Sequence, residues 1–365
     1  MLDGSGAVAC ANATLGEKVR FLSDPCSYPD REHGVEVVET HYSWVFLTRG
    51  HAFKLKKPAH GEGFDFRNVE ARRRNALAEL RLNRRLAPTI YLGMVALTEE
   101  PGGRLCFGGE AEPIDWLVKM VRLDSDFMLD RQLGAGVWHY GELEALADRL
   151  AKFFAHARRL NLAPPAYIAQ LQRELRYALG SLGRASEPRV RCRAVPIIRT
   201  LRAFLTRNEA FFRQRSRFLI DGHGDLRPEH IYLHGMPQII DCLEFRADLR
   251  RLDPLSEIAF LALECDRIRT SPIAARLIQR YRRRCSDLAA ARLLDFYRAF
   301  NALTRARLAA EHVAEPGSRR PEQWIERAND YLEIAGTACR RLACFAPILI
   351  DRLMSSSRRS SRAAL

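Results

Sequence analysis

The spacing of apolar residues changes near position 120, and this change limits the folds open to the chain. Before it, apolar residues form short β-branched or aromatic runs, and Arg49-Gly50 between two of them favours a hairpin. After it, apolar residues recur at i, i+3, i+4 and i+7, which is typical of core-facing helices. The strand candidates are 35–38, 44–47, 52–55, 90–96 and 116–122, and the clearest helix candidates are 68–86, 143–154 and 293–303.

We therefore expect an α+β chain, in which a small antiparallel sheet with one helix precedes a larger, mostly helical lobe. Asp253 followed by Pro254 has the chemistry of a helix N-cap and first turn, so a helix is expected to begin there. The expected divisions are an N-terminal arm or helical cap at 1–34, a smaller lobe at 35–120, a helical lobe at 121–350 and a disordered basic tail at 351–365.

The composition favours a globular protein with a sizeable hydrophobic core and no membrane-spanning segment. The chain has 365 residues, of which 47% are hydrophobic, and its longest apolar runs, such as 342–350, fall short of the roughly 18 residues that a span needs. No basic segment precedes the weakly apolar stretch at 6–11, so we expect no secretory signal and a cytoplasmic location. Nine scattered cysteines without a CxxC pair indicate reduced thiols, not a disulfide framework or a zinc site.

The net charge of +14 suits nucleic acid, an anionic membrane surface or a phosphorylated ligand, and charge alone does not choose among them. Nucleic acid is not the partner we expect, because that interpretation rests on charge alone and the basic stretches lack interleaved aromatic residues. Only six of the 58 basic side chains are Lys, and three of these lie together at 54–57.

The segment His223-Gly-Asp-Leu-Arg-Pro-Glu-His230 carries the sharpest chemical signal. Asp225 lies in it, and Asp241 follows 16 residues later, after strand-like residues at 231–233 and 238–241. Two carboxylates on loops at strand ends suit phosphoryl transfer, in which one orients or deprotonates a hydroxyl and the other holds a metal on the phosphates.

This segment resembles the catalytic loop of aminoglycoside phosphotransferases and related small-molecule kinases, which have the bilobal protein-kinase fold. It also lies close to the Asp-Leu-Lys-Pro-Glu-Asn pattern of protein kinases, with Arg227 and His230 as the changed positions. The resemblance implies that Asp225 is the catalytic base, that Arg227 contacts the transferred phosphoryl group and that Asp241 binds Mg²⁺. It spans roughly residues 17–310 and is closest to a bacterial, largely uncharacterised branch of the family.

The main departure from this pattern is His230, which stands where the family has an Asn that binds the second metal. Imidazole is a poorer ligand for Mg²⁺ than an amide oxygen, so one-metal chemistry, a preference for Mn²⁺ and a degenerate enzyme all stay open. Glu244 matches the same branch and is a further candidate contact to metal or substrate, whereas Asp253 is interpreted as a helix cap.

Kinase-like enzymes also need a strand Lys that holds the nucleotide phosphates and pairs with a Glu on the next helix. We favour Lys54 with Glu70, although Lys56 on the same strand face and Glu79 on the same helix make the pair ambiguous. Further nucleotide-site candidates are Ser43, where the phosphate-covering turn is expected, and Lys119, in a segment at 116–122 that resembles the adenine-binding hinge strand.

The function expected from these features is an ATP- or GTP-dependent phosphotransferase that uses Mg²⁺ or Mn²⁺ and acts on a hydroxyl of a small molecule. The Arg-rich composition favours an anionic acceptor over a cationic one. Two alternatives are a Ser/Thr protein kinase, suggested by Arg227-Pro228-Glu229, and a regulatory nucleotide-binding pseudokinase, suggested by His230.

Overall fold

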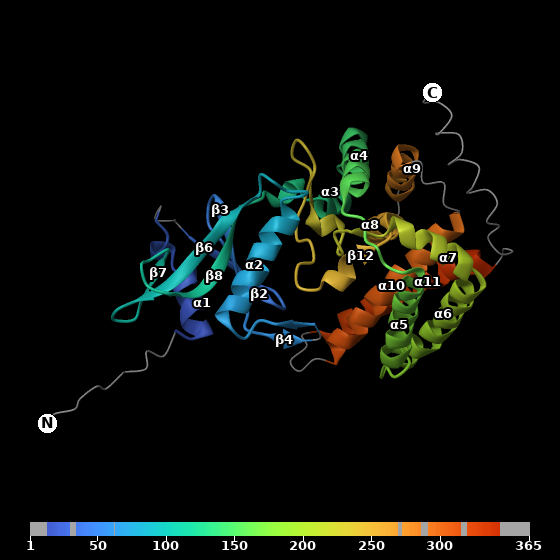
Figure 1. Cartoon of the computed structure of the whole chain (residues 1–365), viewed down its shortest axis with the longest axis horizontal. Coiled ribbons are helices and arrows are strands. Elements are labelled where there is room, and N and C mark those ends of the chain that lie inside the picture. The colour runs from blue at the N-terminus through green and yellow to red at the C-terminus, as the bar shows by residue number, and fades with distance from the viewer. Residues whose placement is uncertain are drawn as a thin grey trace. The chain divides into compact units, whose positions relative to one another are not determined.

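The computed structural model describes residues 13–29, 34–61, 63–268, 272–285, 291–314 and 320–343. The chain divides into two compact units (Figure 1), of which unit 1 is Met1–Phe127 with Gln238–Ala247 and unit 2 is Met128–Pro237 with Asp248–Leu365. Asp241 thus belongs to unit 1 and Asp225 to unit 2. The tail expected at 351–365 lies outside the described residues.

Unit 1 is built on a six-stranded antiparallel sheet with the order β1-β2-β3-β8-β6-β7. Its β-branched and aromatic runs form the strands that alternation predicts. The strands are β1 (Glu36–Glu39), β2 (Ser43–Leu47), β3 (His51–Lys56), β6 (Tyr91–Glu100), β7 (Arg104–Phe107) and β8 (Pro113–Val121), and a separate hairpin joins β4 (His60–Gly61) to β5 (Phe64–Asp65).

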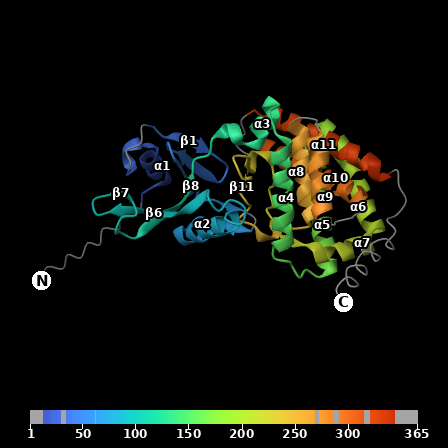
Figure 2. The same ribbon diagram turned by 90° about the horizontal axis from the view of Figure 1, so that it is seen from above.

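Helices α1 (Leu15–Ser23) and α2 (Val69–Asn83) cover opposite faces of this sheet (Figure 2). A capping box starts α1, because the Thr14 hydroxyl accepts from the Glu17 N–H and the Glu17 carboxylate accepts from the Thr14 N–H. Leu22 of α1 packs on Phe46 and Leu55 of the sheet, which gives unit 1 its core on that face. The helix is therefore an integral cover of the sheet.

Asp115 of β8 is the centre of a buried charged triad. Asp115 of β8 binds Arg72 of α2 through two contacts of 2.7 and 2.9 Å, and it accepts from Lys18 of α1 at 2.9 Å. All three side chains are buried. The triad therefore ties both helices to one strand and sets the placement of α2 on the sheet.

Unit 2 is mostly helical, and its long helices α5, α6, α10 and α11 pack along one another (Figure 1). The N-cap expected at Asp253 is confirmed, because its Oδ1 accepts from the Leu255 N–H at 3.0 Å. The same buried carboxylate binds Arg215 at 2.6 Å. The helices are α3 (Leu129–Ala135), α4 (Tyr140–His156), α5 (Pro164–Leu182), α6 (Pro188–Arg207), α7 (Glu209–Arg215), α8 (Pro254–Ile268), α9 (Ile273–Cys285), α10 (Ala291–Val313) and α11 (Pro321–Ala343).

Short strands and turns interrupt the helical part of the chain. In unit 2, β9 (Ile220–Asp221) pairs with β12 (Arg251–Leu252), and β10 (Ile231–Tyr232) follows the His223–His230 loop. In unit 1, β11 (Gln238–Ile239) leads directly into Asp241. Across the described ranges, no helix combines the length and apolar character needed to cross a membrane.

Candidate active site

Lys54 of β3 is the centre of a charged cluster in unit 1. Its Nζ lies 2.8 Å from Glu79 Oε1 of α2 and 2.8 Å from Asp241 Oδ1 of the loop after β11. The Lys54 side chain is 13% exposed, that of Glu79 is 1% exposed and that of Asp241 is 45% exposed. Asp241 is therefore the member of the cluster that is open to a ligand from solvent.

The structure corrects the favoured Lys54–Glu70 pair. Glu70 lies in the first turn of α2, is exposed, and forms an ion pair with Arg73 at 3.4 Å. Nine residues at about 100° each place Glu70 and Glu79 on opposite sides of the helix. Only Glu79 therefore faces Lys54.

Lys56 lies on the same sheet face as Lys54, as its position two residues along the strand predicts. Its Nζ contacts Glu244 Oε1 at 2.6 Å and Glu79 Oε2 at 3.9 Å, so the two lysines share Glu79. Ser43 pairs with Lys56 in the strand register and is buried at the start of β2. The structure thus brings Ser43 onto the face that carries both lysines.

Lys119 does not join this group. It pairs with Phe53 across β8 and β3, and its Nζ lies 5.8 Å from the centre of the Phe53 ring. Directly paired residues of an antiparallel sheet point to the same face, and Phe53 points away from Lys54. The strand position thus places the Lys119 side chain on the α1 face, and the part of this strand in nucleotide binding stays a prediction.

Asp241 is held in an uncommon backbone conformation. Its φ is 59°, in the left-handed region that residues other than Gly seldom adopt. The Asp241 N–H donates to Tyr91 Oη at 3.1 Å, and the next N–H, of Cys242, donates to Asn83 Oδ1 at 2.8 Å. Tyr91 and Asn83 are supporting residues that the sequence did not reveal.

The charges of the cluster shift several pKa values. Burial by itself would lower the pKa of Lys54, but Asp241, Glu79 and Glu244 outweigh burial and hold that pKa well above its ordinary value of 10.5. Burial raises the pKa of the Glu79 carboxyl, against the opposing effect of Lys54. Lys54 thus remains a cation that can attract phosphate oxygens.

The loop that carries Asp225 is held from α8 in unit 2. The buried Glu257 carboxylate accepts from the His223 N–H at 2.9 and 3.1 Å and from the Gly224 N–H at 2.6 Å. Gly224 has a φ of 89°, and a Cβ at Gly222 would lie 2.8 Å from Glu257 Oε2. Both glycines are therefore required by this loop, and Glu257 is a third supporting residue that the sequence did not reveal.

Asp225 faces two of its expected neighbours. Its Oδ2 lies 3.2 Å from Arg227 Nε and 3.7 Å from His230 Nδ1. The structure thus brings Asp225, Arg227 and His230 together as the sequence predicts.

Further out, Glu264 is buried in α8 and accepts from Arg267 Nε at 2.9 Å and from Tyr331 Oη at 2.7 Å. Burial by itself would lower the pKa of Arg305, but the charge of Asp225, followed by Tyr331 and Glu264, raises it. Arg305 therefore stays cationic, and its Nε lies 3.6 Å from Glu264 Oε1.

A divalent cation fits the residues of unit 1 at one carboxylate. Asp241 offers half-exposed oxygen donors, which suit Mg²⁺, whereas Glu244 is 5% exposed and occupied by Lys56. Over the part of the chain that the structure describes, no group of three His, Cys, Asp or Glu side chains is arranged to hold a metal. Asp241 is therefore the carboxylate of the Lys54 cluster whose exposure and oxygen donors fit a divalent cation.

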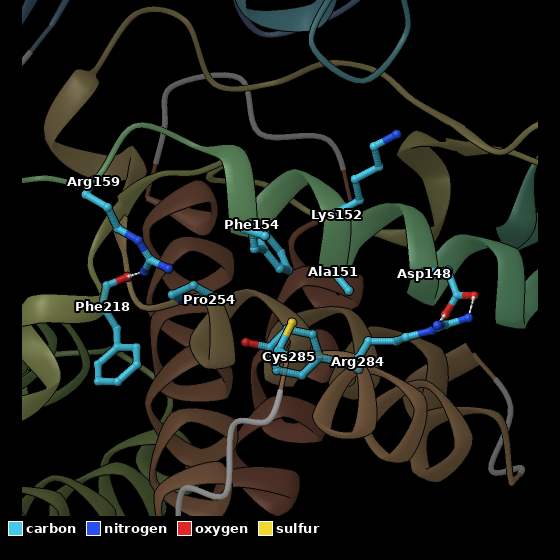
Figure 3. A pocket seen from close by; sticks show the side chains of 11 residues that line it. Asp148, Ala151, Lys152, Phe154, Arg159, Phe218, Pro254, Arg284 and Cys285 are labelled. Carbon is cyan, nitrogen blue, oxygen red and sulfur yellow. Dashed lines mark hydrogen bonds and ion pairs between the residues drawn. The ribbon is translucent and has the colours of Figure 1, made fainter. Parts of the chain in front are cut away.

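A pocket of about 480 Å³ lies elsewhere in unit 2, between α4 and α9 (Figure 3). Phe154 and Tyr281 contribute its apolar lining, and Asp148 binds Arg284 at its edge. None of the residues expected in the active site lines this pocket. It is not part of the candidate active site.

No family model matches the chain. Uncharacterised proteins of Mycobacterium tuberculosis and Mycobacterium bovis are each 33% identical to it over 282 residues, which is 75% of this chain and 54% of the relative. The chain thus spans about half the length of the curated relatives it matches.

Solved structures show the fold. A choline/ethanolamine kinase family protein from Mesorhizobium loti has a TM-score of 0.50 at 13% identity, over 89% of this chain and 99% of that one. A GDP complex of a mutant aminoglycoside 2′-phosphotransferase-IIIa has a TM-score of 0.50 at 14% identity, over 88% and 97%. Choline kinase from Cryptosporidium parvum has a TM-score of 0.50 at 8% identity, over 89% and 96%. The expected fold class is therefore confirmed, and the chain has the α+β, bilobal protein-kinase-like fold of these small-molecule kinases.

Proposed function

We propose that the chain is a metal-dependent phosphotransferase that moves the terminal phosphoryl group of ATP or GTP to a hydroxyl of a small molecule. The observation that carries the proposal is the position of Lys54 at 2.8 Å from both Glu79 and Asp241. A strand Lys fixed by a helix Glu and placed beside a half-exposed Asp suits the binding of a nucleotide with its cation. The neighbours of the same fold are named for choline, ethanolamine and aminoglycosides, and one was solved with GDP.

Asp225 is the proposed base. The acceptor oxygen forms a bond to the γ-phosphorus while the bond from that phosphorus to the β-phosphate bridging oxygen breaks. The hydroxyl proton passes to the Asp225 carboxylate, and the nucleoside diphosphate leaves. Arg227 is the proposed contact to the transferred group, because its guanidinium stands beside Asp225.

In unit 1, Lys54 binds phosphate oxygens and Glu79 keeps its ammonium in place. Asp241 is the proposed anchor of a bound Mg²⁺ or Mn²⁺, which would neutralise charge on the phosphates. Lys56 is held by Glu244 on the same face of β3. The side chain of Glu70 has no part in this arrangement, since it faces away with Arg73.

A pseudokinase is the second candidate, favoured by the His230 ring that replaces the expected metal-binding amide and already contacts Arg227. Nucleotide affinity by calorimetry and nucleotide turnover with Mg²⁺ and Mn²⁺ separate the two. The phosphotransferase predicts that Asp225→Asn abolishes turnover and keeps affinity, whereas Asp241→Ala lowers metal-dependent affinity. Wild-type binding without turnover would favour the pseudokinase, and unchanged Mg-nucleotide affinity in Asp241→Ala would remove Asp241 from the site.

A further inference from the structure

His230 uses both of its ring nitrogens in contacts within its own loop. Nδ1 lies 2.9 Å from the backbone oxygen of Asp225, and Nε2 lies 3.1 Å from a terminal nitrogen of Arg227. The side chain is 9% exposed. The ring is thus enclosed between a carbonyl and a guanidinium.

The chemistry of these partners assigns the tautomer. A carbonyl oxygen only accepts, so Nδ1 of His230 carries the proton and donates to Asp225. A guanidinium only donates, so Nε2 is unprotonated and accepts from Arg227. The lone pair that a metal would need is therefore directed at Arg227.

The contacts form a closed ring. From the Asp225 backbone it passes through His230 to Arg227, and Arg227 Nε returns to the Asp225 carboxylate at 3.2 Å. Arg227 has a long flexible side chain, and an acceptor on its terminal nitrogen limits its rotamers. The ring thus keeps the guanidinium beside the proposed base.

We propose that His230 is a positioning residue that orients Arg227 beside Asp225, and that it does not bind metal. Its catalytic consequence rests on the proposed function, whereas the tautomer and the contact with Arg227 do not. At the loop position where the family has a metal-binding Asn, this chain therefore has a His that supports Arg227.

Two variants separate positioning from metal binding. The amide of His230→Gln reaches the place of Nε2 and can accept from Arg227, whereas the shorter amide of His230→Asn keeps only the contact with the Asp225 carbonyl. Positioning predicts that the Mg²⁺-supported kcat falls about tenfold or more in His230→Asn and less than threefold in His230→Gln, with the nucleotide KM within twofold in both. Metal binding predicts the reverse order, with His230→Asn as active as the wild type or more active, and that result would overturn the proposal. The exposed His234→Asn is the matched control and should leave kcat unchanged.

A second measurement does not depend on turnover. Long-range ¹H–¹⁵N NMR of the wild type, with His230→Asn used for assignment, should show a protonated Nδ1 and an unprotonated Nε2 at His230, and Mg²⁺ with nucleotide should leave that pattern in place. The Arg227 Nε–H signal should move in His230→Asn and stay near its wild-type position in His230→Gln. If the wild type shows no turnover, the proposed function is wrong, but this NMR measurement still tests the contact between His230 and Arg227. A protonated Nε2, or an Arg227 signal that is the same in all three proteins, would overturn the proposal.

Discussion

The Lys54 cluster of unit 1 and the Asp225 loop of unit 2 are built in different ways. In the first, two lysines and three carboxylates from separate segments hold one another through side chains, and Asp241 stays 45% exposed. In the second, backbone N–H groups bind the buried Glu257, and two glycines allow the close approach. We therefore expect the Lys54 cluster to be sensitive to the removal of single charges, and the Asp225 loop to be sensitive to changes in its backbone shape.

The largest effect on unit 1 is expected from Lys54→Met. This change leaves the buried Glu79 with only its longer 3.9 Å contact to Lys56, and the loss of a buried ion partner costs about 3–5 kcal/mol of folding stability. Nucleotide affinity should fall by about 2 kcal/mol or more, roughly thirtyfold. Chemical denaturation and calorimetry check both values. Lys57→Met is the control, because Lys57 pairs with the exposed Glu39, and equal losses in both variants would contradict the assignment.

The matching change in unit 2 is Glu257→Gln. The amide oxygen can take the place of Oε1, but the amide nitrogen then stands in the place of Oε2 and turns an N–H against the His223 N–H. Because the negative charge is also lost, we expect a loss of about 2–3 kcal/mol in the free energy of unfolding. Turnover should fall more than nucleotide affinity, since the loop carries the proposed base. Denaturation curves measured beside the exposed Glu333→Gln test this, and a shift within about 0.5 kcal/mol of that control would show that Glu257 does not hold the loop.

Tyr91→Phe should have a smaller effect. It removes the acceptor of the Asp241 N–H and leaves the ring, which costs about 1 kcal/mol. Because Asp241 loses a restraint on its left-handed backbone, metal-supported nucleotide affinity should fall about fivefold. The measurement is nucleotide affinity with and without Mg²⁺. An equal loss in both conditions would show that Tyr91 does not act through Asp241.

The smallest effect concerns alkaline stability. A raised folded-state pKa of Lys54 contributes stability that is present below its ordinary value of 10.5 and is lost as pH rises through the folded-state value. The difference in unfolding free energy between the wild type and Lys54→Met should therefore be constant from pH 8 to about 10 and should shrink above that. A difference in unfolding free energy that grows above pH 10.5 would mean that the folded-state pKa of Lys54 is lowered, not raised.

Side chains whose chemistry lies in a local motif could be predicted from the sequence. Asp225 and Asp241 stand 16 residues apart beside strand-like runs, and Lys54 stands on a strand. The choice of Glu70 failed because its place in the first turn of the helix does not show which side of that helix faces the sheet. The buried positions Ala76 and Leu80 lie on the side of the helix that presents Glu79.

The supporting residues could not be predicted, because their partners are distant in sequence. Tyr91 and Asp241 are 150 residues apart, and Glu257 is 34 residues from His223. An acidic residue among the buried apolar positions of α8 was the one available signal for Glu257. The partner of His230 is local, but its tautomer depends on the loop shape that Glu257 imposes.

The most direct test of the central claim is ³¹P NMR of the wild type and Asp225→Asn with ATP or GTP, Mg²⁺ and a fraction of small metabolites. We expect the wild type to deplete the γ-phosphate signal and to produce a new phosphomonoester resonance, while Asp225→Asn produces neither. A phosphomonoester that forms equally in both proteins, or an unchanged γ-phosphate in the wild type despite bound nucleotide, would contradict phosphoryl transfer by this site.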